Sequence, residues 1–290
     1  MDLRLGVFLL MTVSTAGKAQ NFEIFSTSIN STLNNSNTVG LRNASININL
    51  PLILNPKKGM LTNSIFFSKY YVDYNTDEIM NTAAIESFNT IKYTLGYSTK
   101  INDTWGFKTN ISPTISSNFE SDITMDDVFF NGSLAFIKSS KNDRLHLGLV
   151  YNTGFGTNKP IPIISYFRKV NNVFSYMLGM PITKIEYAIN TTNQASFYLK
   201  PKGFYSNISD NLIINTADKA EKIKYRTIQS GISYSHAIDE YWKLSLDAGY
   251  QFSTKYELLS NNNSVYEFET KDSFFVGLNL KFDLLKNKKN

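Results

Sequence analysis

The sequence of 290 residues contains two histidines, His146 and His236, and no cysteine. A histidine can activate a serine for ester hydrolysis when a serine and an orienting Asn or Asp lie beside it. Neither "RLHLGLV" around His146 nor "SYSHAID" around His236 has the His-x-Ser-Asn-Gly pattern of outer-membrane phospholipases. We therefore predict that the protein is not an enzyme. A lipid hydrolase that uses one of the two histidines is the alternative.

Oxygen ligands gather in one segment, "SNFESDITMDD", which carries Glu120, Asp122, Asp126 and Asp127 without a basic residue. Such a cluster can hold Ca²⁺, although a solvated acidic loop is the commoner outcome. No histidine pair has metal-ligand spacing, and the glycine-rich "GFGTNKP" is not followed by a helix that could bind phosphate. The sequence therefore predicts no catalytic, metal or cofactor site.

Charged residues that alternate with apolar residues are the clearest indication in the sequence of strands with one polar face. In "WKLSLDAGYQF", residues 242–252, apolar residues alternate with small, polar or charged ones, as in a β-strand with one apolar and one polar face. If such polar faces enclose a lumen, we expect these residues to line it: Lys92, Lys108, His146, Arg226, Lys243 and Asp247. Because cations predominate, the lumen would favour anions or neutral polar solutes.

Segments with this two-residue period recur along the chain, and no useful stretch has the 3.6-residue period of a helix. The segment 88–101 is well beyond the roughly 5 to 6 residues of an ordinary globular strand. We predict 12 to 14 strands and favour fourteen, over residues 22–31, 41–52, 60–74, 88–101, 104–116, 128–139, 144–155, 161–170, 173–180, 182–190, 195–208, 222–238, 241–256 and 271–284.

Short turns and longer polar connections alternate between these segments. Turns are expected at 102–104, 141–144, 170–172 and 238–240, and longer connections at 31–40, 75–87, 117–127, 209–221 and 257–270. Tight turns at one end and long loops at the other are typical of membrane barrels. The predicted fold is all-β, an antiparallel up-and-down transmembrane β-barrel with Trp242, Leu244 and Leu246 facing lipid. A secreted soluble β-sandwich that binds glycans is the alternative.

The N-terminus resembles a secretory signal. Arg4 precedes the apolar run "LGVFLLMTV", and the small residues Gly17 and Ala19 follow it. We expect a signal peptide at 1–19 and one outer-membrane barrel domain at 20–290. The net charge is +5, but Lys and Arg are spread along the chain, so nucleic-acid binding is not predicted.

The stretch 159–208 resembles the core of an uncharacterised outer-membrane β-barrel family of Bacteroidota. The similarity is carried by Pro162, Tyr166, the Asn171–Asn172 turn, the run Leu178–Gly179–Met180–Pro181, Tyr187 and the segment Gly203 to Tyr205. The chain departs from that family at Phe174, where Trp is frequent. It also departs from outer-membrane barrels in general, which typically end on an aromatic residue, because "DLLKNKKN" follows Phe282. The resemblance implies an outer-membrane barrel and supplies no catalytic or binding residues.

The sequence thus predicts a protein of the cell outer membrane that acts as a passive pore or a solute-binding envelope protein. Expected partners are outer-membrane lipid and lipopolysaccharide, the barrel assembly machinery, and small polar or anionic solutes. A structural or interaction barrel with a lumen filled by side chains is a further alternative.

Overall fold

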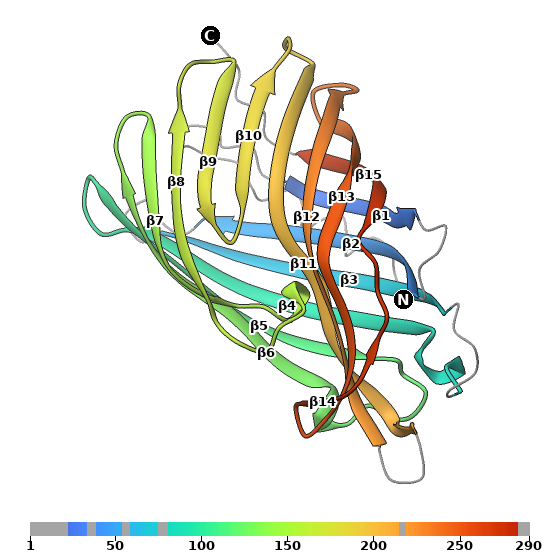
Figure 1. Cartoon of the computed structure of the whole chain (residues 1–290). Coiled ribbons are helices and arrows are strands. Elements are labelled where there is room, and N and C mark those ends of the chain that lie inside the picture. The colour runs from blue at the N-terminus through green and yellow to red at the C-terminus, as the bar shows by residue number, and fades with distance from the viewer. Residues whose placement is uncertain (1–22, 34–38, 54–58, 75–80, 215–218, 284–290) are drawn as a thin grey trace, which may run out of the picture.

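The computed structural model describes residues 23–33, 39–53, 59–74, 81–214 and 219–283 (Figure 1). The predicted signal peptide lies outside these residues. The strands are β1 (Glu23–Leu33), β2 (Val39–Ile53), β3 (Met60–Tyr74), β4 (Ser87–Lys100), β5 (Trp105–Ser117), β6 (Val128–Ser139), β7 (Asp143–Tyr151), β8 (Ile161–Lys169), β9 (Phe174–Met180), β10 (Thr183–Ala188), β11 (Asn193–Ile213), β12 (Lys219–Ala237), β13 (Trp242–Ser260), β14 (Asn263–Phe268) and β15 (Ser273–Asp283).

Three short 3₁₀ helices interrupt the connections: η1 (Ala83–Ile85), η2 (Met125–Asp127) and η3 (Thr153–Phe155). No helix in the described ranges is long and apolar enough to cross a membrane.

The antiparallel ladder closes on itself. β1 pairs with β2 on one edge and with β15 on the other, where Glu23 lies opposite Asp283. β13 pairs with β12, and its second edge pairs first with β15 along 242–251 and then with β14 along 256–260. Because β14 and β15 share one position in the wall, the barrel has fourteen strand positions. The predicted barrel is confirmed, and the β-sandwich is excluded.

The two ends of the barrel differ in their connections. The end where β1 begins and β15 finishes, here named the terminus end, also carries the short connections 101–104, 140–142, 170–173, 189–192 and 238–241. The opposite end, the loop end, carries the three 3₁₀ helices within the longer connections 75–86, 118–127 and 152–160. The predicted alternation of short and long connections is present at these positions, but the loop end also carries the short connection 181–182 between β9 and β10.

Four terminus-end turns use the same side-chain chemistry. In each, a side-chain oxygen accepts hydrogen bonds of 2.7 to 3.0 Å from the backbone N–H groups two and three residues ahead. The accepting residues are Asn102, Asn171, Asn190 and Asp239. Asn and Asp favour such turns because their side chains satisfy amides that the tight turn leaves unpaired.

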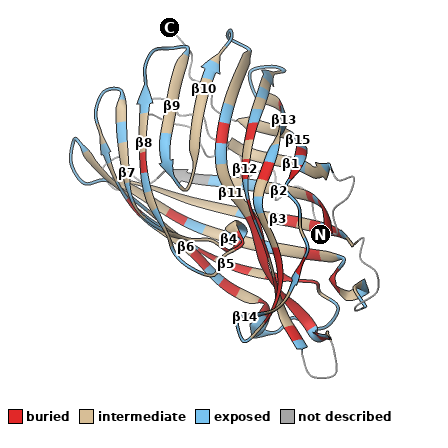
Figure 2. Cartoon of the chain, in the orientation of Figure 1, coloured by how far each residue is buried: buried red, intermediate tan, exposed pale blue. Residues whose placement is uncertain are grey.

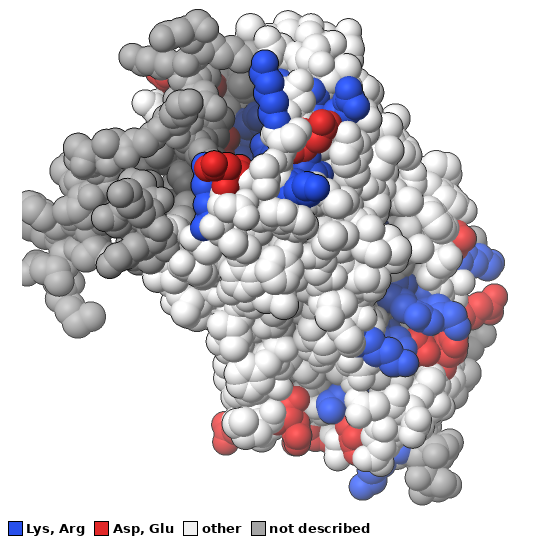
Figure 3. All heavy atoms as spheres, turned by 90° about the vertical axis from the view of Figure 1, so that its left-hand side faces the viewer, with Lys and Arg blue, Asp and Glu red and all other residues white. Residues whose placement is uncertain are grey.

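Large apolar side chains are exposed on the outward face at every strand position. One example from each position is Ile29, Ile46, Ile65, Ile91, Ile111, Leu134, Leu147, Ile164, Leu178, Tyr187, Phe197, Ile232, Leu246 and Leu278. In Figure 3, charged residues gather at the top, at the right edge and at the bottom of the view, and a broad uncharged surface lies between these groups. This apolar belt matches the surface that a barrel presents to lipid.

A β-bulge changes the direction of the side chains within β13. Ile228 on β12 lies opposite Phe252 and Arg226 lies opposite Lys255, so β13 contains one extra residue at this point. Ser253 within the bulge has a φ of 54°. Inward positions are odd-numbered before the bulge, as at Gln251, and even-numbered after it, as at Tyr256.

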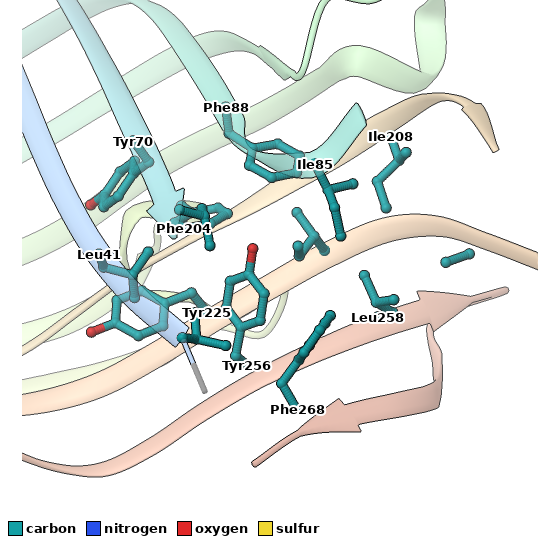
Figure 4. Close-up of a cluster of buried hydrophobic side chains, with 14 of the residues drawn as sticks. Leu41, Tyr70, Ile85, Phe88, Phe204, Ile208, Tyr225, Tyr256, Leu258 and Phe268 are labelled. Carbon is teal, nitrogen blue, oxygen red and sulfur yellow. The ribbon is translucent and has the colours of Figure 1, made fainter. Parts of the chain in front are cut away.

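The loop end is filled by a hydrophobic core (Figure 4), and buried residues concentrate there (Figure 2). Residues 203–209 of β11 are buried without alternation. Phe204 packs on Tyr70 at a ring distance of 4.5 Å, whereas its neighbour Tyr205 packs on Phe129 at 5.6 Å. β11 also forms a parallel bridge to β5, with Asn207 opposite Ser117. Protein therefore covers both faces of β11 near the loop end.

Two predicted loops are strands in the structure. β11 continues to Ile213 and β12 begins at Lys219, within the expected connection 209–221. β13 continues to Ser260, and β14 lies within the expected connection 257–270. These extensions supply Leu212, Ala220, Leu258 and Phe268 to the core, so their apolar side chains meet protein in place of solvent.

Candidate functional site

The lumen contains a polar cavity of about 320 Å³. A second cavity of about 380 Å³ shares Ser28, Ser45, Phe66, Lys92 and Asn279 with the first, so the two are parts of one space, here named the lumen cavity. The second part extends to Asn49 and Lys281, toward the terminus end. Volumes of this size are usual for small-molecule sites.

The wall of the lumen cavity is rich in hydroxyl and amide groups because polar residues occupy the inward positions of β1 to β6. Neighbouring strands are joined there by hydroxyl pairs, including Ser28 with Ser45 at 2.8 Å and Thr90 with Ser116 at 2.8 Å. Asn131 adds an amide that donates to Thr114 at 2.8 Å. The same groups can exchange these bonds for bonds to a polar solute.

Lysines enter the lumen cavity from opposite walls. Lys92 lies on β4, and Lys200 and Lys202 lie on β11. The Lys92 ammonium is 4.7 Å from the centre of the Phe66 ring, and the Lys200 ammonium is 4.5 Å from the centre of the Tyr198 ring. These contacts hold the side chains in place without neutralising them.

One carboxylate, Asp247, faces these lysines in the first part of the cavity. It accepts a hydrogen bond from the amide of Asn279, which lies on the neighbouring strand β15. In the second part, Lys281 is paired with Glu23 at 2.7 Å. Positive charge therefore predominates in the part of the cavity that lies deeper in the barrel.

The hydrophobic core closes the lumen cavity on its loop side. Tyr70 and Phe204 belong both to the cavity wall and to the core. Behind them Tyr225, Tyr256 and Phe268 are each at most 2 % exposed. The hydroxyl groups of Tyr74 and Tyr256 are 2.6 Å apart. The barrel interior is therefore polar toward the terminus end and apolar toward the loop end.

The structure places five of the six predicted lumen-lining residues on the inward face. Lys92 and Asp247 line the cavity itself. On β5, Lys108 has the same parity as the cavity residue Thr114. In the ladder this face continues through Ala135 to Gly148 on β7, which has the same parity as His146, while Lys243 lies opposite the cavity residue Lys281. Directly opposed residues share a face of the sheet, so these three side chains also point inward.

Arg226 is the exception. It lies next to Tyr225, which belongs to the core, so Arg226 points outward, and its Nε is 4.0 Å from Glu257. Lys224 pairs with the same carboxylate at 2.7 Å. The prediction assumed that the polar face of this strand points inward. At the loop end the interior is apolar, so the polar face of β12 points outward instead.

Neither histidine has a hydrolase-like setting. His236 is exposed on β12, and its Nδ1 lies 2.8 Å from the side-chain oxygen of Asn193. The Nε2 atom of His146 is buried without a hydrogen-bond partner. Within the described ranges, no hydrogen bond joins either histidine to a serine hydroxyl. The lipid-hydrolase alternative therefore gains no support from this geometry.

The acidic segment 120–127 is organised by protein groups. The Asp127 carboxylate is buried, accepts the backbone N–H of Thr124 at 2.7 Å and accepts the Asn207 amide at 2.9 Å. Asp126 is exposed. In the described part of the chain, no group of three or more His, Asp or Glu side chains has an arrangement that could hold a metal ion.

Lys200 and Lys202 were not among the predicted lumen residues. The signal lies in "FYLKPKGFY", where Tyr198, Lys200, Lys202 and Phe204 occupy alternate positions. This face mixes aromatic and cationic residues, so simple polarity does not indicate its direction. The strand pairing shows that this face points inward, because Phe204 lies opposite the core residue Tyr225.

Comparison with solved structures returns channel-like barrels. An outer membrane channel from Pseudomonas putida F1 is 9% identical, with a TM-score of 0.48 and coverage of 93% of this chain and 97% of that one. The P. putida toluene transporter TodX is 8% identical, with a TM-score of 0.45 and coverage of 94% and 92%. The NanC porin is 6% identical, with a TM-score of 0.42 and coverage of 89% and 100%.

Such low identities and TM-scores carry no information about the solute. A comparison with curated protein sequences found no match. The taxonomic part of the resemblance noted from the sequence stays a prediction. A family model, by contrast, matches residues 23–284, which include the whole described barrel. The chain belongs to the family described as Domain of unknown function (DUF6268).

Proposed function

We propose that this protein is an outer-membrane β-barrel that binds small polar solutes in a basic lumen. The observation that carries the proposal is a lysine-containing polar cavity inside a closed barrel with an apolar outer belt. An apolar exterior suits lipid, and a polar interior suits a solute from water. Outer-membrane lipid and lipopolysaccharide would contact the belt, and the barrel assembly machinery would insert it.

The geometry favours a solute-binding barrel over a passive open pore. The core at the loop end includes Tyr256 and Ile223, both 0 % exposed, and the lumen cavity extends from there toward the terminus end. Short turns in outer-membrane barrels face the periplasm. In the proposed orientation, solute enters from the periplasmic side and the core separates it from the outside.

The outer-membrane location of the protein and the closure of its lumen can be tested together. We expect the protein in the outer-membrane fraction, with a gel mobility that shifts on boiling as a folded barrel unfolds. In a planar lipid bilayer, the folded protein should give no steady conductance, because the core blocks the passage. Recovery in a soluble fraction would contradict the proposed location. A steady conductance proportional to voltage would show an open pore and contradict the closed lumen.

A further inference from the structure

Three lysine side chains line the lumen cavity without forming a salt bridge. Lys92, Lys200 and Lys202 line the same space, and none forms an ion pair with any carboxylate in the described ranges. Asp247, which accepts a hydrogen bond from Asn279, is the one carboxylate in this wall and offsets only one of the three positive charges. By contrast, Lys281 in the second part of the cavity is paired with a glutamate, and so are Lys184 and Lys224 elsewhere in the barrel.

This arrangement opposes the stability of the empty protein. Lys200 and Lys202 are two positions apart on one strand, which separates their backbones by about 7 Å, and Lys92 faces them across the lumen. Like charges at such distances repel each other, and withdrawal from bulk water strengthens the repulsion. An anion bound among the three lysines would turn this unfavourable field into a favourable one.

The remaining wall indicates what else the ligand carries. Amide and hydroxyl groups surround the lysines, including those of Asn30, Asn43, Ser68, Thr90, Thr114 and Asn131. These groups both donate and accept hydrogen bonds, as needed to recognise several hydroxyl groups on one solute. The rings of Phe66 and Tyr70 offer apolar surface beside them. A simple inorganic anion would leave most of this wall unused.

We propose that the lumen cavity is a binding site for a small polyhydroxylated anion, such as a sugar-sized molecule that carries a carboxylate or a phosphate. The anionic group binds among Lys92, Lys200 and Lys202, and the hydroxyl groups contact the amides and hydroxyls of β1 to β6. This inference rests on the proposed solute-binding function and names its ligand class.

The site can be tested by isothermal titration of the folded protein in detergent with glucuronate, glucose 6-phosphate and glucose. We expect at least one of the two anions to bind about tenfold or more tightly than glucose, because a charge-assisted contact is absent from the neutral sugar. The stronger of the two anions then identifies carboxylate or phosphate as the preferred group.

A triple variant, Lys92→Gln, Lys200→Gln and Lys202→Gln, should weaken binding of the preferred anion by about tenfold or more. It should also raise the thermal midpoint of the ligand-free protein, because repulsion is removed. The control Lys69→Gln changes a lysine on β3 whose ammonium lies over the Tyr71 ring, outside the cavity, and should leave binding unchanged.

The outcomes separate this inference from the proposed function. Equal binding of glucose and both anions would overturn the anionic ligand class but would still support the proposed binding of polar solutes. No binding of any of the three by heat-shifting, correctly folded protein would overturn the inference, whereas location and closure are decided by fractionation and conductance. Unchanged anion binding in the triple variant would show that the lysines do not form the site.

Discussion

The two ends of the barrel are made from the same strands but fill their interiors differently. Toward the terminus end, polar side chains point inward and apolar side chains point outward, so Lys200 and Lys202 face the lumen cavity while Leu199 is exposed. Toward the loop end, β11 is buried on both faces, and the interior contains aromatic side chains such as Phe204. The first region resembles the inside of a pore and the second the core of a soluble protein.

This difference shows how one barrel can combine a solute site with a barrier. A fourteen-position wall leaves room for water and solutes in its interior. β11 reduces that room when it lies against β5, where Ser206 and Ser116 are hydrogen-bonded at 3.1 Å. The core then stabilises the narrowed end by removing apolar surface from water. Stability and solute binding are therefore located at opposite ends.

We expect the largest loss of folding stability from Tyr256→Ala, which removes a ring from the core at the loop end. Tyr256 is 0 % exposed and contacts Tyr74, Phe204, Tyr225 and Phe268 in the core. Removal of the ring leaves a cavity among them and should lower the free energy of unfolding by about 3 to 5 kcal/mol. Denaturant titration of the folded protein in detergent measures this change.

The matched control is Tyr250→Ala on the same strand, before the bulge. Tyr250 is 40% exposed on the outward face, so the loss should be about 1 kcal/mol or less. Similar losses for the two variants would mean that the loop end has no core of the kind described.

A smaller effect is expected from Asp127→Ala, which tests the polar support of the same end. The buried carboxylate joins η2 to β11 through Thr124 and Asn207. Its removal leaves buried donors without acceptors and should cost about 2 kcal/mol in unfolding free energy. The adjacent Asp126→Ala changes an exposed carboxylate and should stay within about 0.5 kcal/mol of the parent. A larger loss for Asp126→Ala would contradict a structural role confined to Asp127.

The sequence predicts the terminus end better than the loop end, for a physical reason. Alternation reveals that a strand has two faces, and an apolar exterior then implies a polar interior, which places Lys92 and Asp247 correctly in the cavity wall. At the loop end both sides of the sheet contact protein or polar surroundings. Alternation alone therefore predicts that Arg226 points inward, whereas its side chain points outward. It also gives no direction for the side chains of Lys200 and Lys202.

The core at the loop end depends on contacts between residues far apart in the sequence. Tyr70 packs on Phe204, and Tyr74 packs on Tyr256. Neither partner indicates the other from its local pattern. The bulge that turns Tyr256 inward was also not predictable, because "FSTKY" contains no glycine or proline to mark it.

The bulge itself provides the smallest and most specific test. Ser253 is exposed and has a φ of 54°, a left-handed conformation that glycine adopts at lower cost. Ser253→Gly should therefore raise the free energy of unfolding by about 0.5 kcal/mol, even though glycine ordinarily weakens a strand. Ser230→Gly on β12, where no positive φ occurs, should lower it by about 0.5 to 1 kcal/mol. Opposite signs for the two variants in the same denaturant titration would support a left-handed residue at 253, whereas a loss of stability in both would contradict it.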